Sequence, residues 1–132
     1  MMESVSRAFH RTPNRQGLVI GVIPCGVVAG RPKDGYPNEW VELPIHTHLP
    51  LSGKRGTDPL SRNHINVLSA DAIVALPGGS GTASEVELAV RYGKPLIAFL
   101  PSANEIPELP AEIAVSDDLE IVLQFIRDVL LR

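Results

Sequence analysis

The chain has 132 residues, a formal net charge of −3 and an apolar content of 44%. This size and composition predict one folded domain with a hydrophobic core and exclude a disordered chain. The small net charge provides no basic surface for nucleic acid. A single cysteine, Cys25, rules out an intramolecular disulfide and favours a reducing compartment. We find no run long enough to span a membrane and no signal-peptide pattern, so we expect a cytoplasmic protein.

The first part of the chain alternates apolar segments with loops. Residues 1–11 predict a short helix, which a proline soon ends. Residues 18–23 are all apolar or glycine, which predicts a strand buried on both faces of a parallel sheet. Residues 40–45 predict a shorter strand. Between the two strands, residues 27–38 predict a Gly- and Pro-rich loop that can fold over a ligand.

The middle of the chain carries histidines and cations whose roles the sequence leaves open. His46 and His48 share one face of an extended segment, because strand side chains alternate. Together with His64 they suggest a three-histidine metal site, but no fourth ligand has metal-site spacing, so we expect no metal. Lys54 and Arg55 either reach a phosphate or are solvated.

A helix over residues 62–68 is predicted next, with Ser61 as its N-cap. Arg62 falls in its first turn, where a cation opposes the helix dipole. This unfavourable placement suggests an anionic partner for Arg62, either a bound ligand or Glu85. The alternative is an ordinary surface arginine.

The most informative stretch runs from an apolar strand into a helix. Residues 72–76 predict a short strand, and a helical pattern follows until Gly93 ends it. Between them stand three glycines, Gly78, Gly79 and Gly81. A strand, a glycine-rich turn and a helix N-terminus together form an anion site, because the first-turn amides have no partner inside the helix.

Two side chains of this predicted helix are candidates for contact with the ligand. Thr82 can cap the helix and also offer a hydroxyl group to the ligand. Glu85 is predicted in the first turn, beside the same amides. Its carboxylate either caps the helix, where the dipole favours negative charge, or points at the sugar of the ligand or at a water molecule.

The run Pro77-Gly78-Gly79-Ser80-Gly81-Thr82-Ala83-Ser84-Glu85 resembles the PGGxGTxxE motif of a superfamily with Rossmann-like folds. This superfamily includes molybdenum-cofactor carrier proteins and the "lonely guy" phosphoribohydrolases, long described as lysine decarboxylases. Arg62 stands at the spacing of the catalytic arginine of the hydrolases. The resemblance covers about residues 17–100. It implies a phosphate site made of Pro77, Gly78, Gly79, Ser80, Gly81 and Thr82.

The remaining elements complete an α/β pattern. Residues 95–100 and 111–115 predict strands, and residues 118–131 predict a helix with a wide apolar stripe. We therefore expect one domain over residues 1–132, a Rossmann-like parallel sheet with helices on both faces. The relatives begin with a strand, a glycine-rich turn, a helix and a second strand that have no counterpart in this sequence. The resemblance thus implies an N-terminally reduced sheet with exposed edges, which favours a homo-oligomer.

Two functions remain open. The first is binding of a phosphorylated small molecule, a nucleotide or a molybdopterin-type cofactor, as in the carrier proteins. Ser84 supports it, because the hydrolases usually carry a second acid at this position. The second is cleavage of the N-glycosidic bond of a nucleoside 5′-monophosphate, with Glu85 near the anomeric carbon and Arg62 on the phosphate or base. A lysine decarboxylase is disfavoured, because no pyridoxal-phosphate lysine motif is present.

Overall fold

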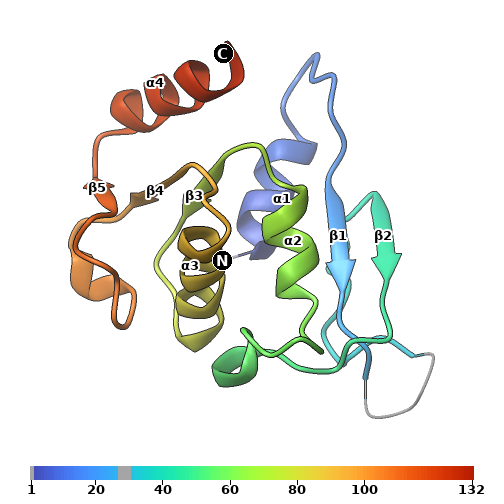
Figure 1. Cartoon of the computed structure of the whole chain (residues 1–132). Coiled ribbons are helices and arrows are strands. Elements are labelled where there is room, and N and C mark those ends of the chain that lie inside the picture. Colours follow the sequence, from blue (N-terminus) through green and yellow to red (C-terminus); the bar gives the residue numbers. More distant parts are fainter. Residues whose placement is uncertain (1, 27–30) are drawn as a thin grey trace.

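A computed structural model describes residues 2–26 and 31–132 of the chain, so residues 27–30 of the predicted loop lie outside it. Strands and helices alternate along the chain, as the sequence predicts (Figure 1). The elements are α1 (Met2–His10), β1 (Ile20–Ile23), β2 (Leu43–His46), η1 (Gly53–Arg55), α2 (Asn63–Ser69), β3 (Ile73–Ala75), α3 (Ser80–Arg91), β4 (Leu96–Phe99), η2 (Ala103–Glu105), β5 (Ala114–Ser116) and α4 (Leu119–Leu130). No described helix is both long and apolar enough to cross a membrane.

The strands are all parallel to their neighbours, which confirms the predicted α/β, Rossmann-like arrangement. They form two sheets. β1 pairs with β2, while β4 pairs with β3 on one side and with β5 on the other. Figure 1 shows the two sheets apart, with α2 drawn between them. Within the described residues no strand pairs with the second edge of β1 or of β3, so the expected single sheet is divided into two.

The core lies between α3 and the larger sheet. One buried cluster joins β3, β4, α3 and the segment after η2, and it contains Ala75, Val86, Ala98, Leu100 and Ile106. A second cluster joins α2 to α3 through Val67, Leu88 and Ala89. On α3, Val90 is 43% exposed, whereas Leu88 is fully buried. Packing of α2 against α3 explains this difference. Val67 of α2 contacts the side of α3 that carries Leu88, so this side of the helix is buried.

The last helix is less covered than its sequence predicts. α4 contacts β4 and β5, but only Val122 of its predicted stripe is buried. Leu119 and Leu130 are 54% and 59% exposed. The three-stranded sheet is too small to cover the whole apolar face of a 12-residue helix.

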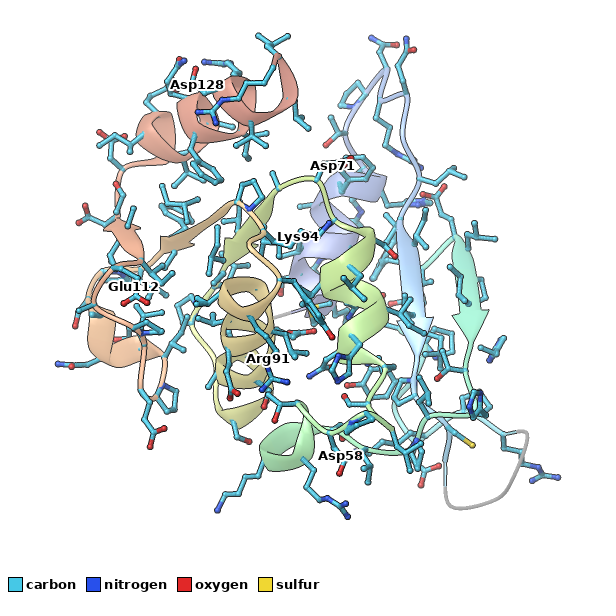
Figure 2. The ribbon with its side chains drawn as sticks, viewed as in Figure 1. Asp58, Asp71, Arg91, Lys94, Glu112 and Asp128 are labelled. Carbon is cyan, nitrogen blue, oxygen red and sulfur yellow. The ribbon has the colours of Figure 1, made fainter. Side chains whose placement is uncertain are left out.

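The ends of α2 and α3 are joined by a lysine. Lys94 follows α3 and donates hydrogen bonds from Nζ to the carbonyl oxygens of Leu68 and Ala70, at 2.8 and 2.9 Å (Figure 2). A cation is favourable at this point, because the last carbonyl groups of α2 carry its negative dipole end. The contact fixes α2 beside α3, and both helices supply residues to the site described below.

A partly exposed ion pair holds the segment before β1 to the segment before β2. Arg15 Nη2 donates to Glu42 Oε1 at 2.8 Å, and the backbone amide of Val19 donates to Glu42 Oε2 at 2.8 Å. The hydrogen bond from Arg15, followed by that from Val19, lowers the pKa of Glu42 below its ordinary value of 4.5. The stabilisation is therefore complete above about pH 4.5 and is lost as the pH falls through the lower pKa of the folded state.

We expect Glu42→Gln to lower the melting temperature at pH 7. We also expect the melting temperature of the variant to decrease less than that of the native chain when the pH is lowered. The variant has no carboxylate to protonate, so it lacks the stability that the native protein loses in acid. Thermal unfolding followed by circular dichroism between pH 7 and pH 3 measures both values. Glu87→Gln is the control, because Glu87 pairs with Arg91 on an exposed helix face. Equal acid responses of Glu42→Gln and the native chain would contradict the assignment.

Candidate functional site

The glycine-rich turn connects the end of β3 to the start of α3. α3 begins at Ser80, with Gly79 as its N-cap residue and no side-chain capping bond. The prediction that Thr82 caps this helix is therefore wrong, because Thr82 is already inside its first turn. Glu85 is the sixth residue of α3 and lies in the second turn, not in the first as the sequence suggested. Its carboxylate thus does not cap the helix.

The amide groups of this turn are mostly free to bind an anion. The amide of Gly78 is occupied, since it donates to the carbonyl oxygen of Glu105 at 3.1 Å. The first helical hydrogen bond runs from Ala83 to the carbonyl oxygen of Gly79, at 3.0 Å. In the described part of the chain, the four amides of residues 79–82 have no protein acceptor. They lie at the positive end of the α3 dipole, which favours a bound negative group.

The three glycines of the turn have different reasons to be glycine. A Cβ on Gly78 would overlap Thr82 Oγ1, so close packing requires glycine there. A Cβ on Gly79 or on Gly81 would meet no protein atom within 4 Å. Neither of these two residues has a positive φ. The protein fold therefore does not require glycine at 79 or 81, and the open space beside them leaves the backbone accessible to a ligand.

Arg62 and Glu85 come together next to this turn. Arg62 Nη1 lies 3.8 Å from Glu85 Oε1, and the two side chains are 12% and 34% exposed. Asn66 Nδ2 donates to the same carboxylate oxygen at 3.2 Å. Ser61 Oγ accepts a hydrogen bond from the amide of Asn63 at 3.2 Å, but the N-cap residue of α2 is Arg62, so the prediction of Ser61 as N-cap and of Arg62 inside the first turn is wrong by one residue. The sequence suggested two anionic partners for Arg62, a bound ligand and Glu85. The structure places Glu85 beside Arg62.

Arg62 also has hydrogen-bonding capacity that its protein partners do not use. Its Nε is buried without an acceptor among the described residues. Its guanidinium carbon lies 5.9 Å from the ring centroid of Tyr36. Arg62 lines a cavity of about 410 Å³ that runs along β1 and also contains Asn66. A buried donor without an acceptor lowers the stability of the folded protein. A ligand that accepted a hydrogen bond from Arg62 Nε would remove this cost, so the cavity favours a ligand with an acceptor at this point.

Two further hollows flank the glycine-rich turn. One, of about 400 Å³, runs along β3 and contains Pro77, Gly78, Thr82 and Glu85. The other, of about 820 Å³, lies on the Ser80 side and contains Lys54. The two cations of the predicted loop differ in their surroundings: Lys54 lines this second hollow, whereas Arg55 pairs with Asp58 at 3.0 Å. η1 is held to α3 by Ser84, whose Oγ lies 2.8 Å from the carbonyl oxygens of Gly53 and Ser80.

The model of the SLOG cluster4 family matches residues 1–123. The chain belongs to this family. Among solved structures, the molybdenum cofactor carrier protein MCP from Chlamydomonas reinhardtii is similar to it, with a TM-score of 0.54 and 24% sequence identity. The similarity covers 88% of this chain and 64% of that one, so the chain spans less than two thirds of the length of MCP. At this identity the likeness shows the fold alone. No curated protein matches the sequence.

The histidines of this SLOG cluster4 chain do not gather into one site. His46 and His48 lie beside Cys25 in a separate cavity at the end of β2. His64 is placed elsewhere, with Nδ1 at 2.7 Å from the hydroxyl of Tyr92 and Nε2 at 3.0 Å from the carbonyl oxygen of Asp58. Within residues 2–26 and 31–132, no group of three His, Cys, Asp or Glu residues is placed to hold a metal ion.

Sequence reasoning missed two residues of the site, Asn66 and Tyr36. Asn66 is four residues after Arg62, which places both on one face of α2, so helical spacing could have indicated it. Tyr36 gave no local signal. It belongs to an irregular loop, and only the fold brings its ring to Arg62.

Proposed function

We propose that this chain binds a phosphorylated small molecule, with a phosphate held by the amides of Gly79, Ser80, Gly81 and Thr82. The observation that carries the proposal is that none of these amides has a protein acceptor within the described residues. The open space beside the two glycines supports it further. Lys54 is the cation that lines the hollow beside Ser80, and the carboxylates of Glu87 and Glu108 line the same hollow, so the free amides carry the proposal.

The class of ligand that fits is a nucleotide or a molybdopterin-type cofactor, both of which carry phosphate. MCP, the solved structure with a similar fold, is a molybdenum cofactor carrier protein by its name. The residues of this turn fit the phosphate of such a cofactor, because they offer free amides and no opposing carboxylate among their first three helical positions. The free thiol of Cys25 fits a reducing compartment, and we place the protein in the cytoplasm.

A second function is favoured by the contact between Arg62 and Glu85. Glu85 lines the same hollow as the turn and is held by Asn66 and Arg62. In a nucleoside 5′-monophosphate bound through its phosphate, this carboxylate would orient a water molecule or stabilise the positive charge that develops on the sugar. The water would add across the N-glycosidic bond, which gives the free base and ribose 5-phosphate.

The test is incubation of the purified chain with AMP, GMP, CMP and inorganic phosphate, while the melting temperature and the free base are measured. A bound ligand at 100 times its Kd stabilises the chain by about 2.7 kcal/mol, so a clear rise in melting temperature is expected. A rise without free base supports the binding protein, and release of base supports the hydrolase. If none of these compounds nor a molybdopterin-type cofactor shifts the melting temperature, the phosphate site is wrong.

Glu85→Gln separates the two functions. In a hydrolase the variant is expected to release base at least about 100-fold more slowly, because charge stabilisation at the sugar is lost. Its ligand-induced shift in melting temperature should remain, because the phosphate amides are unchanged. Glu120→Gln serves as the control, since it removes an exposed carboxylate from α4, outside the hollows that flank the glycine-rich turn. Undiminished base release by Glu85→Gln would remove Glu85 from the mechanism.

A further inference from the structure

The cavity that contains Arg62 adjoins the hollow that runs along β3 beside the glycine-rich turn. Met2 and Asn66 line both spaces, so the two meet at these side chains. In Figure 1, α1 and α2, which carry these residues, lie between the two sheets. A ligand whose phosphate lies at the turn can therefore extend past Asn66 into the cavity. What the cavity binds is then the other end of that ligand, so the inference rests on the proposed function.

The walls of the cavity suit a flat and largely apolar ring. Its volume is about 410 Å³, which lies within the range of small-molecule sites. Ile20, Val22 and Val41 supply apolar side chains to it. Tyr36 also lines it, and the ring centroid of Tyr36 lies 5.9 Å from the guanidinium carbon of Arg62. A nucleic-acid base or a similar ring can stack on such an aromatic side chain.

Arg62 gives this cavity hydrogen-bond donors that lack partners. Its Nε is buried and has no acceptor among residues 2–26 and 31–132. Its Nη1 lies 3.8 Å from Glu85 Oε1, which is too far for a hydrogen bond. A guanidinium has several N–H donors and no acceptor. The ligand group that fits beside it is therefore a hydrogen-bond acceptor, such as the carbonyl oxygen of a ring.

Glu3 of α1 lines the same cavity. Among the residues that the structure describes, no Lys, Arg or His side chain lies within ion-pair distance of its carboxylate. Glu3 and Arg62 thus border one space without pairing with each other. An ionised carboxylate only accepts hydrogen bonds, whereas a guanidinium only donates them. A ring that satisfies both must carry an acceptor and, next to it, donors.

We propose that this cavity binds an aminopyrimidinone ring, the ring that guanine and pterin share. The carbonyl oxygen of the ring accepts a hydrogen bond from the Arg62 guanidinium, and its N–H and amino groups donate to the Glu3 carboxylate. Arginine reads guanine, and carboxylates accept from the amino groups of bases, by the same pairing in nucleic-acid recognition. Adenine fits less well, because it has no carbonyl oxygen and places a ring acceptor beside its amino group. Glu3 therefore selects the ring, while the glycine-rich turn holds the phosphate.

The first test is isothermal titration calorimetry of the full chain with GMP, IMP and AMP. The Kd of GMP is expected to be at least about 10-fold lower than that of AMP. IMP keeps the carbonyl oxygen but lacks the amino group, so its Kd should lie between the two. This comparison uses the native chain, so it does not depend on the folding of a variant.

Glu3→Gln tests the carboxylate. A glutamine amide offers one donor and one acceptor, the pair that matches adenine, so the preference for GMP over AMP should fall below about 3-fold. Glu39→Gln is the control, because Glu39 is also exposed and is not among the residues that line this cavity. It should keep the preference of the native chain. Circular dichroism checks that both variants are folded.

Nuclear magnetic resonance reports on Arg62 directly. GMP is expected to shift the Nε–H signal of Arg62, which the Arg62→Lys variant identifies by its absence. Inorganic phosphate should leave this signal in place, because it binds at the turn. Guanosine and pterin carry the ring without a phosphate, so each should shift the signal at higher concentration. Whichever of the two acts at the lower concentration identifies the ring.

The outcomes separate this inference from the proposed function. If AMP binds as tightly as GMP, if Glu3→Gln keeps the preference, or if GMP leaves the Arg62 signal in place, the ring pocket is wrong. Binding of inorganic phosphate or AMP in that case still supports the phosphate site. If guanosine or pterin shifts the Arg62 signal but the phosphate adds no affinity, the ring pocket stands and the phosphate site is wrong. If no compound binds, both are wrong.

Discussion

Gly81→Ala is expected to abolish binding of phosphorylated ligands while the chain itself becomes no less stable. The added methyl group meets no protein atom within 4 Å, so it costs no packing. It projects instead into the open space beside the free amides, where the phosphate would approach. Because alanine is favoured over glycine in a helix by up to about 1 kcal/mol, the melting temperature of the free protein should stay equal or rise. Most mutations that destroy a binding site lower stability, so this combination is diagnostic.

The measurement is the melting temperature of Gly81→Ala with and without AMP or the cofactor that shifts the native chain. Gly93→Ala is an informative control at the other end of α3. It also adds a methyl group in open space, but Gly93 has φ +62°, a left-handed conformation that penalises alanine. That variant should lose about 1 kcal/mol of stability and keep the ligand-induced shift. A full ligand-induced shift in Gly81→Ala would show that the phosphate does not approach this backbone.

The site could be predicted to the extent that it is local in the sequence. The strand, the three glycines and the following helix are adjacent, and the predicted placement of Arg62 at the positive end of a helix suggested Glu85 as one of its two candidate partners. The exact start of α3 could not be predicted. The amide of Gly78 is held by the carbonyl oxygen of Glu105, which is 27 residues away, and this contact fixes where the turn ends. No local pattern around Thr82 contains that information.

The fold shows the same division between local and distant causes. Alternating apolar segments were sufficient for the order of strands and helices and for their parallel pairing, but they did not predict the division into two sheets. They were not sufficient to predict which face of α3 is buried. Leu88 is buried because Val67 of α2 packs against it, whereas Val90 is exposed. Nor could they predict the exposed fraction of Ile20, since a strand sequence suited to burial on both faces says nothing about whether a cover is present.

Gly56→Ala tests whether η1 must pack closely on α3 to form the site. Gly56 is buried, and a Cβ built on it would lie 2.5 Å from Ser84 Cβ and 2.6 Å from Asn63 Nδ2. Both neighbours are themselves buried, so neither can move without disturbing the packing of its helix. Overpacking of this kind costs about 1–3 kcal/mol. For a chain of this size the melting temperature should fall by roughly 4–12 °C.

The same variant should also weaken ligand binding, because Lys54 belongs to η1 and depends on the hydrogen bond from Ser84 to Gly53 for its place beside Ser80. Differential scanning calorimetry and the ligand-induced shift measure the two effects. Ser84→Gly removes the closest obstructing atoms, so adding it to Gly56→Ala should cost less than the sum of the two single changes. If the two changes instead add, or if Gly56→Ala melts within 2 °C of the native chain, this junction tolerates the extra volume and does not hold Lys54 against the glycine-rich turn.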